Sequence, residues 1–349
     1  MRIGTTSIFL ALMGLCAASA APIAAKAESY TGKTVQFVVG FTGGTGFDLQ
    51  SRLIARHIGD YLPGKPNVIV QNMPGAGSIK AGDYLYFNAV KDGTVIGMID
   101  PGVFTSQMLG DPQIRFDATK FTWIGRMVNN TPVLITWYKS PIHKTNDLFT
   151  RQAMISAGGP TPRLNYLLLN TVLHSKIKTI LGYSGSSDAM IAMERGEVDG
   201  LSQPWPVTKL IKPDWIADKK IFAVLQTGYE KDPDLPDVPR MIDLTKNESD
   251  RKLFEFFALP SLLGRAVLAP PNIPAQQATE LRAGFQAMLK GRPFLDEADK
   301  TKTDLAPLTG EEMQGLMANN AGFSPEVLER AKGIAVLDAK QAKEAGQAN

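Results

Sequence analysis

The sequence predicts an α/β protein with mainly parallel sheets, and its 349 residues allow two domains. Short apolar strands alternate with helices along the chain, which is the pattern of parallel sheets. Several of these strands, among them residues 35–39 and 153–156, run into small-residue loops that open a helix. In such sheets ligands bind at the carboxyl ends of the strands, so these loops mark the expected site.

The first loop, residues 41–48, has the sequence FTGGTGFD. Gly43, Gly44 and Gly46 carry no Cβ, so an anion can come close to the backbone amides at the helix start. Asp48 is expected to cap that helix. The local sequence leaves two interpretations open, a receiving loop for a small carboxylate and a tight turn without a ligand.

The rest of the chain repeats this arrangement. A second loop, residues 71–78, joins a strand at 68–70 to a helix at about 79–89, and a third strand follows at 95–99. From about Trp123 a second set begins, with strands at 133–138, 153–156, 179–183 and 198–201 and with loops at 157–163 and 184–188 that again lead into helices. Beyond a proline-rich loop at 232–239 we expect a strand within 262–274, helices at 275–289 and 312–337, and a frayed tail.

Residues 1–27 match a secretory signal peptide. Arg2 supplies the positive start, and residues 8–17 form an apolar run that is too short to span a bilayer. Of two A-x-A sites, 18–20 and 25–27, we prefer the second, so that the mature chain starts at Glu28; the alternative is a buried N-terminal helix. The single cysteine, Cys16, lies in this segment after Leu15, which does not suit lipid attachment. We expect an exported chain without a lipid anchor or a disulfide.

Composition argues against nucleic acid as a partner. The chain is 44% hydrophobic and 20% charged, with a formal net charge of +3. Residues 1–27 hold two of the 37 basic residues and none of the 34 acidic ones, so the remainder is almost neutral. Nucleic-acid binding needs a basic stripe, and the sequence has no such cluster.

Three features come near to catalytic motifs without completing them. Residues 59–65 have P-loop spacing, but Pro66 follows the lysine and offers neither a hydroxyl nor an N–H. Residues 182–186 approach a nucleophile elbow, with Ser186 in place of the final glycine. His57, His143 and His174 have no partner at triad or metal-ligand spacing. We predict no catalytic residue, no metal site and no cofactor.

Three side chains near the loops suit a ligand. Arg163 follows a glycine-rich turn at a helix start, where its guanidinium can pair with a carboxylate through two hydrogen bonds. The plain alternative is a solvated surface arginine. Phe41 and Phe47 flank the first loop, and either can wall an apolar side of the cleft or pack in the core.

At these loops the sequence resembles the periplasmic solute-binding receptors of tripartite tricarboxylate transporters, the Bug receptors. Their motif F-P-P-G-G-G-T-D corresponds to residues 41–48, their N-R-P-G-A-G-G to residues 72–78 (NMPGAGS), and their P-D-G-Y-T to residues 91–95 (KDGTV). Their Y-K-G-S and G-G-Q-V-D resemble residues 183–186 (YSGS) and 195–199 (RGEVD). The likeness runs from about Thr34 to Lys332.

The resemblance implies a type II periplasmic binding protein fold, in which two α/β domains close on a ligand like a Venus flytrap. Domain I would comprise residues 28–128 and 251–349, and domain II residues 129–250. By position, the ligand contacts would fall on two loops of each domain, at Phe41, Thr42, Gly43, Gly44, Thr45, Gly46, Phe47, Asp48, Pro74, Gly75, Ala76, Gly77, Ser78, Ala157, Gly158, Gly159, Thr161, Arg163, Tyr183 and Ser184.

The departures from the family motifs concern the ligand. Thr42 and Gly43 replace two prolines, Thr45 replaces a glycine and Phe47 replaces a threonine. The family's G-x-G-S-x-x-H loop is represented by residues 158–163 (GGPTPR), so that a hydroxyl and a histidine are lost and an arginine is gained. We hypothesise that Arg163 takes over a carboxylate contact and that Phe47 enlarges the apolar side.

The expected function is that of a non-enzymatic periplasmic receptor for a di- or tricarboxylate or a related organic acid. It would act as a monomer together with the inner-membrane permease of a tripartite transporter. Two other functions stay open. A periplasmic hydrolase or isomerase would act on a carboxylated substrate in the same cleft and leave it changed. A ligand-sensing partner of a membrane kinase would share the fold and the binding site.

Overall fold

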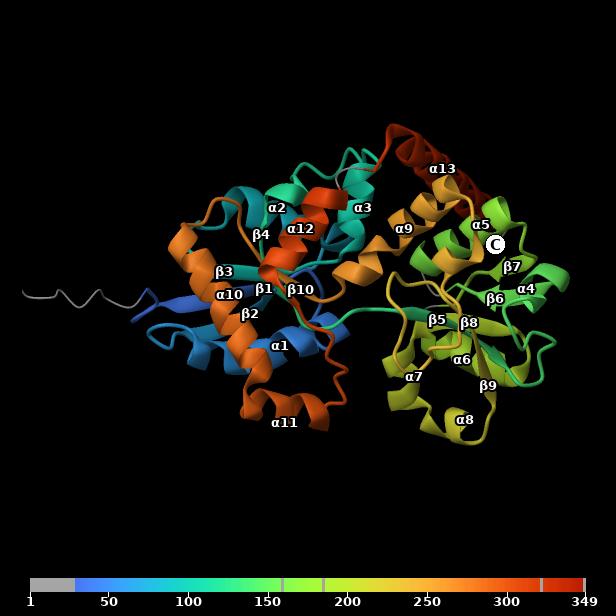
Figure 1. The fold of residues 1–349 in the computed structure, drawn as a ribbon, viewed down its shortest axis with the longest axis horizontal. Helices are drawn as coiled ribbons and strands as arrows, with labels where there is room; N and C mark the ends of the chain where they lie inside the picture. The colour runs from blue at the N-terminus through green and yellow to red at the C-terminus, as the bar shows by residue number, and fades with distance from the viewer. Residues whose placement is uncertain (1–28, 158–159, 184–185, 321–322, 348–349) are drawn as a thin grey trace, which may run out of the picture.

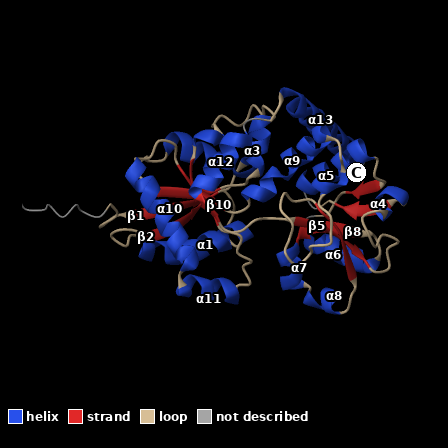
Figure 2. Ribbon diagram, viewed as in Figure 1, coloured by secondary structure: helices blue, strands red, loops and turns tan. Residues whose placement is uncertain are grey.

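The computed structural model describes residues 29–157, 160–183, 186–320 and 323–347, and it shows two α/β lobes side by side (Figure 1). The first lobe is built on a six-stranded sheet and the second on a five-stranded sheet, and helices cover both (Figure 2). The predicted α/β class with two sheet-based units is therefore confirmed. The predicted signal peptide, residues 1–27, lies outside the described residues.

The sheet of the first lobe has the strand order β11-β4-β10-β3-β1-β2. Its strand β1 pairs in parallel with β2 and β3, whereas β10 runs antiparallel to β3 and β4. The apolar run predicted as the first strand is indeed buried in this lobe. The strands are β1 (Thr34–Val39), β2 (Asn67–Asn72), β3 (Val95–Met98), β4 (Thr122–Arg126), β10 (Ala266–Ala269) and β11 (Leu308–Thr309).

The sheet of the second lobe has the order β7-β6-β8-β5-β9. Its strand β6 is parallel to β7 and β8, and β5 is antiparallel to β8 and β9. The strands are β5 (Pro132–Trp137), β6 (Ala153–Ser156), β7 (Ile177–Ile180), β8 (Gly200–Pro204) and β9 (Ile221–Gln226).

The expectation of mainly parallel sheets was wrong, because both sheets are mixed. The antiparallel pairs of the described strands all involve β4, β5 or β10. Strands β5 and β10 each follow a passage of the chain from one lobe to the other. A strand that arrives from the opposite lobe enters at the edge where the parallel strands end, so it must run against them.

The helices cover the two sheets and connect their strands. Those of the first lobe are α1 (Gly46–Ile58), α2 (Ile79–Asp83), α3 (Gly102–Met108), α10 (Ala275–Lys290), α11 (Arg292–Lys300) and α12 (Gly310–Asn320). Those of the second lobe are α4 (Asp147–Thr150), α5 (Pro160–Leu173), α6 (Ser186–Arg195), α7 (Trp205–Ile211) and α8 (Pro213–Ala217), and α9 (Glu248–Leu263) and α13 (Pro325–Gln347) pack beside α5 (Figure 1).

The prediction of one helix over 312–337 with a frayed tail was wrong. Two helices, α12 and α13, occupy this stretch, and α13 continues to Gln347. Pro325 starts the second of them, at a position where its missing N–H costs no hydrogen bond. The new helix packs its buried residues Val327, Ala331 and Ile334 into the core that contains α5 and α9.

This packing bears on the predicted domain boundaries at residues 128 and 250, which remain a prediction. The core of the second sheet includes Leu168 of α5, Phe254 of α9 and Ala331 of α13. We propose that α13, which was assigned to domain I with the rest of 251–349, be counted with the second lobe.

Two of the segments that cross between the lobes, residues 127–131 and 261–265, lie side by side. Arg265 N donates to Val128 O at 2.8 Å, and Asn130 N donates to Ser261 O at 3.1 Å. Gly264 has a φ of 51°, and a Cβ there would lie 2.2 Å from Val128 O. Only glycine fits this close approach of the two segments.

Candidate ligand-binding cleft

The first loop is fixed by Asp48, although not in the way expected. Thr45, not Asp48, is the N-cap of α1, and its Oγ1 accepts from Asp48 N at 3.4 Å. The Asp48 carboxylate accepts from Gly44 N and Asn72 Nδ2, both at 2.8 Å, and pairs with Arg52 at 3.0 Å. The hydrogen bond from Arg52 is the main cause that lowers the pKa of Asp48 to about 2. This buried carboxylate is saturated, so its role is to hold the loop.

The second loop is locked against the end of β1. Ser78 is buried, and its Oγ donates to Gly40 O at 3.0 Å. A Cβ on Gly40 would lie 2.3 Å from that Oγ, so the contact requires glycine. Ala76 and Ser78 both have positive φ angles, 45° and 76°, which are strained for residues with a Cβ. The loop therefore presents its exposed residues 74–77 in one fixed shape.

Beside the first loop, Phe41, Phe47 and Arg265 form a three-layer stack. The rings of Phe41 and Phe47 lie 3.9 Å apart at an angle of 14°. The guanidinium carbon of Arg265 lies 3.5 Å from the centre of the Phe47 ring. The Phe41 ring and the Arg265 guanidinium are both too close to the Phe47 ring to lie on the same face of it, so Phe47 lies between them. Its ring is thus a platform for the arginine.

Arg265 stands at the end of a crossing segment and directly before β10. In the part of the chain that the structure describes, its guanidinium has no ion pair and no hydrogen bond. Burial lowers the pKa of Arg265 to about 10, and the nearby Asp100 opposes this shift. At neutral pH the group is a protonated, poorly hydrated cation whose five donors are free.

Asp100 is the acidic neighbour of this arginine. Leu268 of β10 pairs antiparallel with Gly97 of β3, so Arg265, just before β10, and Asp100, shortly after β3, lie at the same end of this pair of strands, and the charge of Asp100 acts on Arg265. Asp100 Oδ1 accepts from Gly102 N at 2.7 Å at the start of α3. Burial raises the pKa of Asp100 above its ordinary value. One cation and one acid therefore lie close together between the lobes. We call this pair, Arg265 and Asp100, the floor of the cleft.

Two cavities lie between the lobes, one on each side of this floor. The α1–α7 cavity measures about 340 Å³, and its walls include Gly46 and Leu49 of α1, Val207 and Leu210 of α7, and Arg265. The α3–α5 cavity measures about 350 Å³. Its walls include Ala76 and Gly77 of the second loop, Asp100, and Thr161 and Asn165 of α5.

The sequence-predicted site residues are divided between these places. Of the first loop, Gly46 lines the α1–α7 cavity, whereas Ala76, Gly77 and Thr161 line the α3–α5 cavity. Thr42, Gly43, Gly44, Pro74 and Gly75 are exposed, and Gly158, Gly159 and Ser184 lie outside the described residues. Their contact with a ligand remains a prediction.

The remaining predicted residues have partners within the protein. Ala157 is buried, and its N–H donates to Ile180 O. Tyr183 packs against the core under β8. Arg163 forms a two-pronged ion pair with Asp338 of α13, at 2.5 and 2.7 Å. The hypothesis that Arg163 binds a ligand carboxylate gains no support from this geometry, because its guanidinium already donates to the Asp338 carboxylate.

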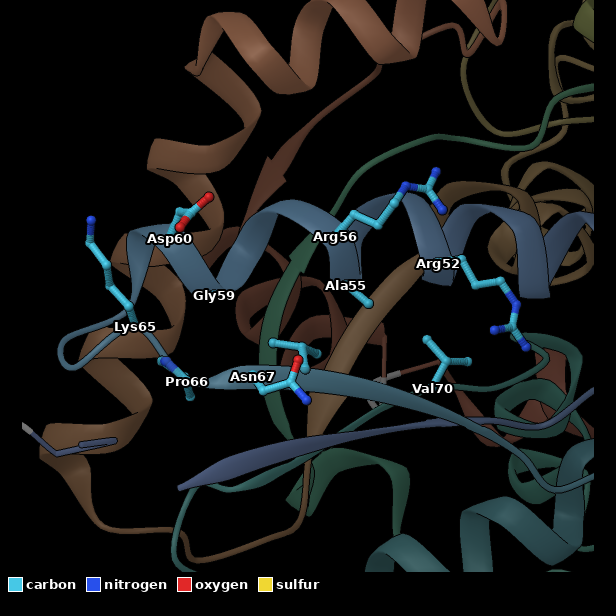
Figure 3. A pocket seen from close by; sticks show the side chains of 10 residues that line it. Arg52, Ala55, Arg56, Gly59, Asp60, Lys65, Pro66, Asn67 and Val70 are labelled. Atoms are coloured by element: carbon cyan, nitrogen blue, oxygen red, sulfur yellow. The ribbon is translucent and has the colours of Figure 1, made fainter. Parts of the chain in front are cut away.

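A third cavity of about 360 Å³ lies on the outer side of the first lobe, between α1 and β2 (Figure 3). It contains the stretch with P-loop spacing, including Gly59 and Lys65. Figure 3 shows the Lys65 side chain directed away from the groove. Arg52 and Arg56 at its edge are paired with Asp48 and Glu297. None of the predicted ligand contacts lines this groove.

The fold has known counterparts, although no family model matches the chain. It is similar to the crystal structure of a TctC solute-binding protein from Polaromonas, with a TM-score of 0.65 and 16% identity over 86% of this chain and 97% of that one. It is also similar to an R. palustris protein, Rpa4515, solved with adipate, with a TM-score of 0.57 and 20% identity over 88% and 97%. The chain has the fold of the periplasmic solute-binding proteins.

One curated relative supports the same likeness. The UPF0065 protein in the gbd 5' region of Cupriavidus necator is 24% identical over 254 residues, which are 68% of this chain and 73% of that protein. The resemblance predicted from the loops is confirmed at the level of the fold.

Sequence reasoning missed the two charged residues of the cleft floor. Arg265 was predicted only as part of a strand, and Asp100 follows a predicted strand without any glycine-rich motif. One signal was available. Each lies at the end of an apolar strand run, where a lone charge is unexpected unless it faces a cleft.

Proposed function

We propose that the protein is a periplasmic receptor that captures a small carboxylic acid between its two lobes. The observation that carries this proposal is the guanidinium of Arg265. Its carbon lies 3.5 Å from the centre of the Phe47 ring, burial lowers its pKa, and among the described residues it has no acceptor. A carboxylate suits an unpaired guanidinium group, because its two oxygens accept two parallel N–H hydrogen bonds.

The position of Arg265 also connects binding to movement of the lobes. Its backbone N–H bonds to Val128 of the other crossing segment, so an anion held by its side chain lies at the junction of the lobes. A ligand that contacts both lobes at once favours the arrangement in which they are close together. This is how a receptor can signal to a partner that it is loaded.

The partner and the location follow from the resemblance and the fold. We propose that the loaded receptor docks on the inner-membrane permease of a tripartite transporter, and that it works as a monomer in the periplasm after export by residues 1–27. In the described residues, no helix is long and apolar enough to cross a membrane, and no group of acidic, histidine or cysteine side chains could hold a metal ion.

Isothermal titration calorimetry of the chain from Glu28 tests the proposal. The panel contains mono-, di- and tricarboxylates, aromatic acids and neutral sugars. We expect one acid to bind per chain, and Arg265→Met to weaken that binding about 100-fold, because the carboxylate loses its charged partner. Because burial lowers the pKa of Arg265 to about 10, affinity should fall as the pH rises through this value and Arg265 loses its proton.

The matched control is Arg292→Met, which removes an exposed arginine that lines neither cavity and should leave affinity unchanged. Chromatography of the ligand recovered after incubation separates a receptor from an enzyme, since a receptor returns the acid unaltered. The proposal would be refuted if a neutral sugar bound and none of the acids in the panel did.

A further inference from the structure

The α1–α7 cavity has walls that are unusually apolar for the site of an anion. Leu49 on α1 and Leu210 on α7 are 59% and 49% exposed, and both line this cavity from opposite lobes. Leu53, Val128, Pro206 and Val207 extend the same surface. Large exposed aliphatic side chains that face one cavity mark a binding surface for an apolar group.

The charges around this cavity leave one cation free for a ligand. Arg52 is paired with Asp48, Arg56 with Glu297, and Asp304 with Lys209. Lys302 stands at the exposed rim, where water screens its charge. Arg265 is therefore the only desolvated and unpaired cation among the described residues of this wall.

One neutral polar group accompanies it. Gln50 lines the same cavity, and its Oε1 is buried without a hydrogen-bond partner in the described part of the chain. An amide in this position can turn to offer either its N–H or its oxygen. A buried polar atom without a partner is uncommon, and a polar group of a ligand would satisfy it.

We propose that the ligand is a monocarboxylic acid with an apolar body, bound in the α1–α7 cavity. This inference rests on the proposed receptor function and names its ligand class. The carboxylate pairs with Arg265 over the Phe47 ring, and the body lies between Leu49 and Leu210. A second carboxylate lying between these two leucines would lose its hydration without an ionic partner there.

Two matched ligand series test the proposal by calorimetry. The first is the straight-chain monocarboxylates from butanoate to octanoate, and the second is the dicarboxylates of the same lengths. We expect affinity to rise about fourfold for each added methylene of the monocarboxylates, as apolar burial requires. Each dicarboxylate should bind at least about tenfold more weakly than the monocarboxylate of equal length.

Variants of the apolar wall locate the body of the ligand. Leu210→Asn should reduce the gain per methylene from about fourfold to less than twofold. Ile211→Asn is the control, since Ile211 is 44% exposed on the same helix but does not line the cavity. A wall that served only to close the lobes would weaken every acid by the same factor and leave the gain per methylene intact.

The outcomes separate this inference from the receptor function. If dicarboxylates bind as tightly as monocarboxylates, or if Thr161→Ala in the α3–α5 cavity weakens binding while Leu210→Asn does not, the ligand class is wrong and the receptor stands. If no acid of either series or of the wider panel binds, the proposed function itself is wrong. Circular dichroism of each variant confirms that it is folded.

Discussion

The two cavities of the cleft are similar in size and differ in the charge of their linings. The α1–α7 cavity holds the free cation Arg265 and a wall of aliphatic side chains. The α3–α5 cavity has two acids, Asp100 and Asp111, no basic residue among its described lining, and an unsatisfied acceptor at Asn165 Oδ1. The first therefore offers an unpaired cation to a ligand, and the charged groups of the second are acidic.

This difference teaches that loop motifs alone do not locate an anion. Ala76, Gly77 and Thr161, which the motifs select, lie in the acidic cavity, where a carboxylate would meet like charges. The cation that can hold a carboxylate lies across the floor, on a segment that no motif marks. The loops build the cleft, and the charge of Arg265 decides which half suits an acid.

Among the residues around Arg265, the largest effect is expected from removing the aromatic platform on which its guanidinium rests. Phe47→Leu keeps an apolar side chain but takes away the ring on which the guanidinium lies, so the arginine loses its fixed orientation. We expect acids to bind about tenfold more weakly in calorimetry, with little change in the melting temperature. Phe41→Leu, one layer farther from the guanidinium, should cost less than about threefold. Equal losses in the two variants would mean that the stack serves packing and not the arginine.

A smaller effect of opposite sign is expected on the other side of the floor. Asp100→Asn removes the negative charge that faces Arg265 and keeps an oxygen to accept from Gly102 N. Without this competing charge, the arginine should bind acids about fivefold more tightly. Asp111→Asn is the control, because Asp111 lines the same cavity but is not among the charges that influence Arg265. A weaker affinity in Asp100→Asn would place the ligand in the acidic cavity.

The sequence was sufficient for the parts of the fold that depend on local pattern. Strand β1, its glycine-rich loop and α1 follow from apolar spacing and from residues without a Cβ, and the structure contains all three, although α1 starts at Gly46 and not after Asp48. Strand direction was not predictable, because β5 and β10 run against their neighbours only as a result of where the chain crosses between lobes.

The pairing of side chains across long stretches of sequence was equally hidden. Arg163 was a reasonable candidate for a carboxylate, but its partner is Asp338, which is 175 residues away. Arg265 gave no motif, and its importance comes from two distant residues, since Phe47 supports it and Asp100 faces it. Local sequence patterns predict secondary structure and loops. Whether a charged side chain stays unpaired depends on which distant residues the fold brings next to it.

The smallest effect is expected from an ion pair at the rim of the α1–α7 cavity, and it tests whether this pair helps to hold the two lobes together. Lys209 of α7 pairs with Asp234 of its own lobe at 2.6 Å and with Asp304, beyond α11, at 2.8 Å, and the second of these ion pairs joins the two lobes at the rim of the cavity. Both side chains are partly exposed, so the pair is worth less than about 1 kcal/mol and is screened by salt. Lys209→Met should weaken acid binding about twofold at low ionic strength and have no effect at high ionic strength. Lys212→Met, which breaks a pair with Glu194 inside the second lobe, should change nothing at either. If both variants behave alike, the rim pair does not contribute to the arrangement of the lobes, and the cavity walls are held by the crossing segments alone.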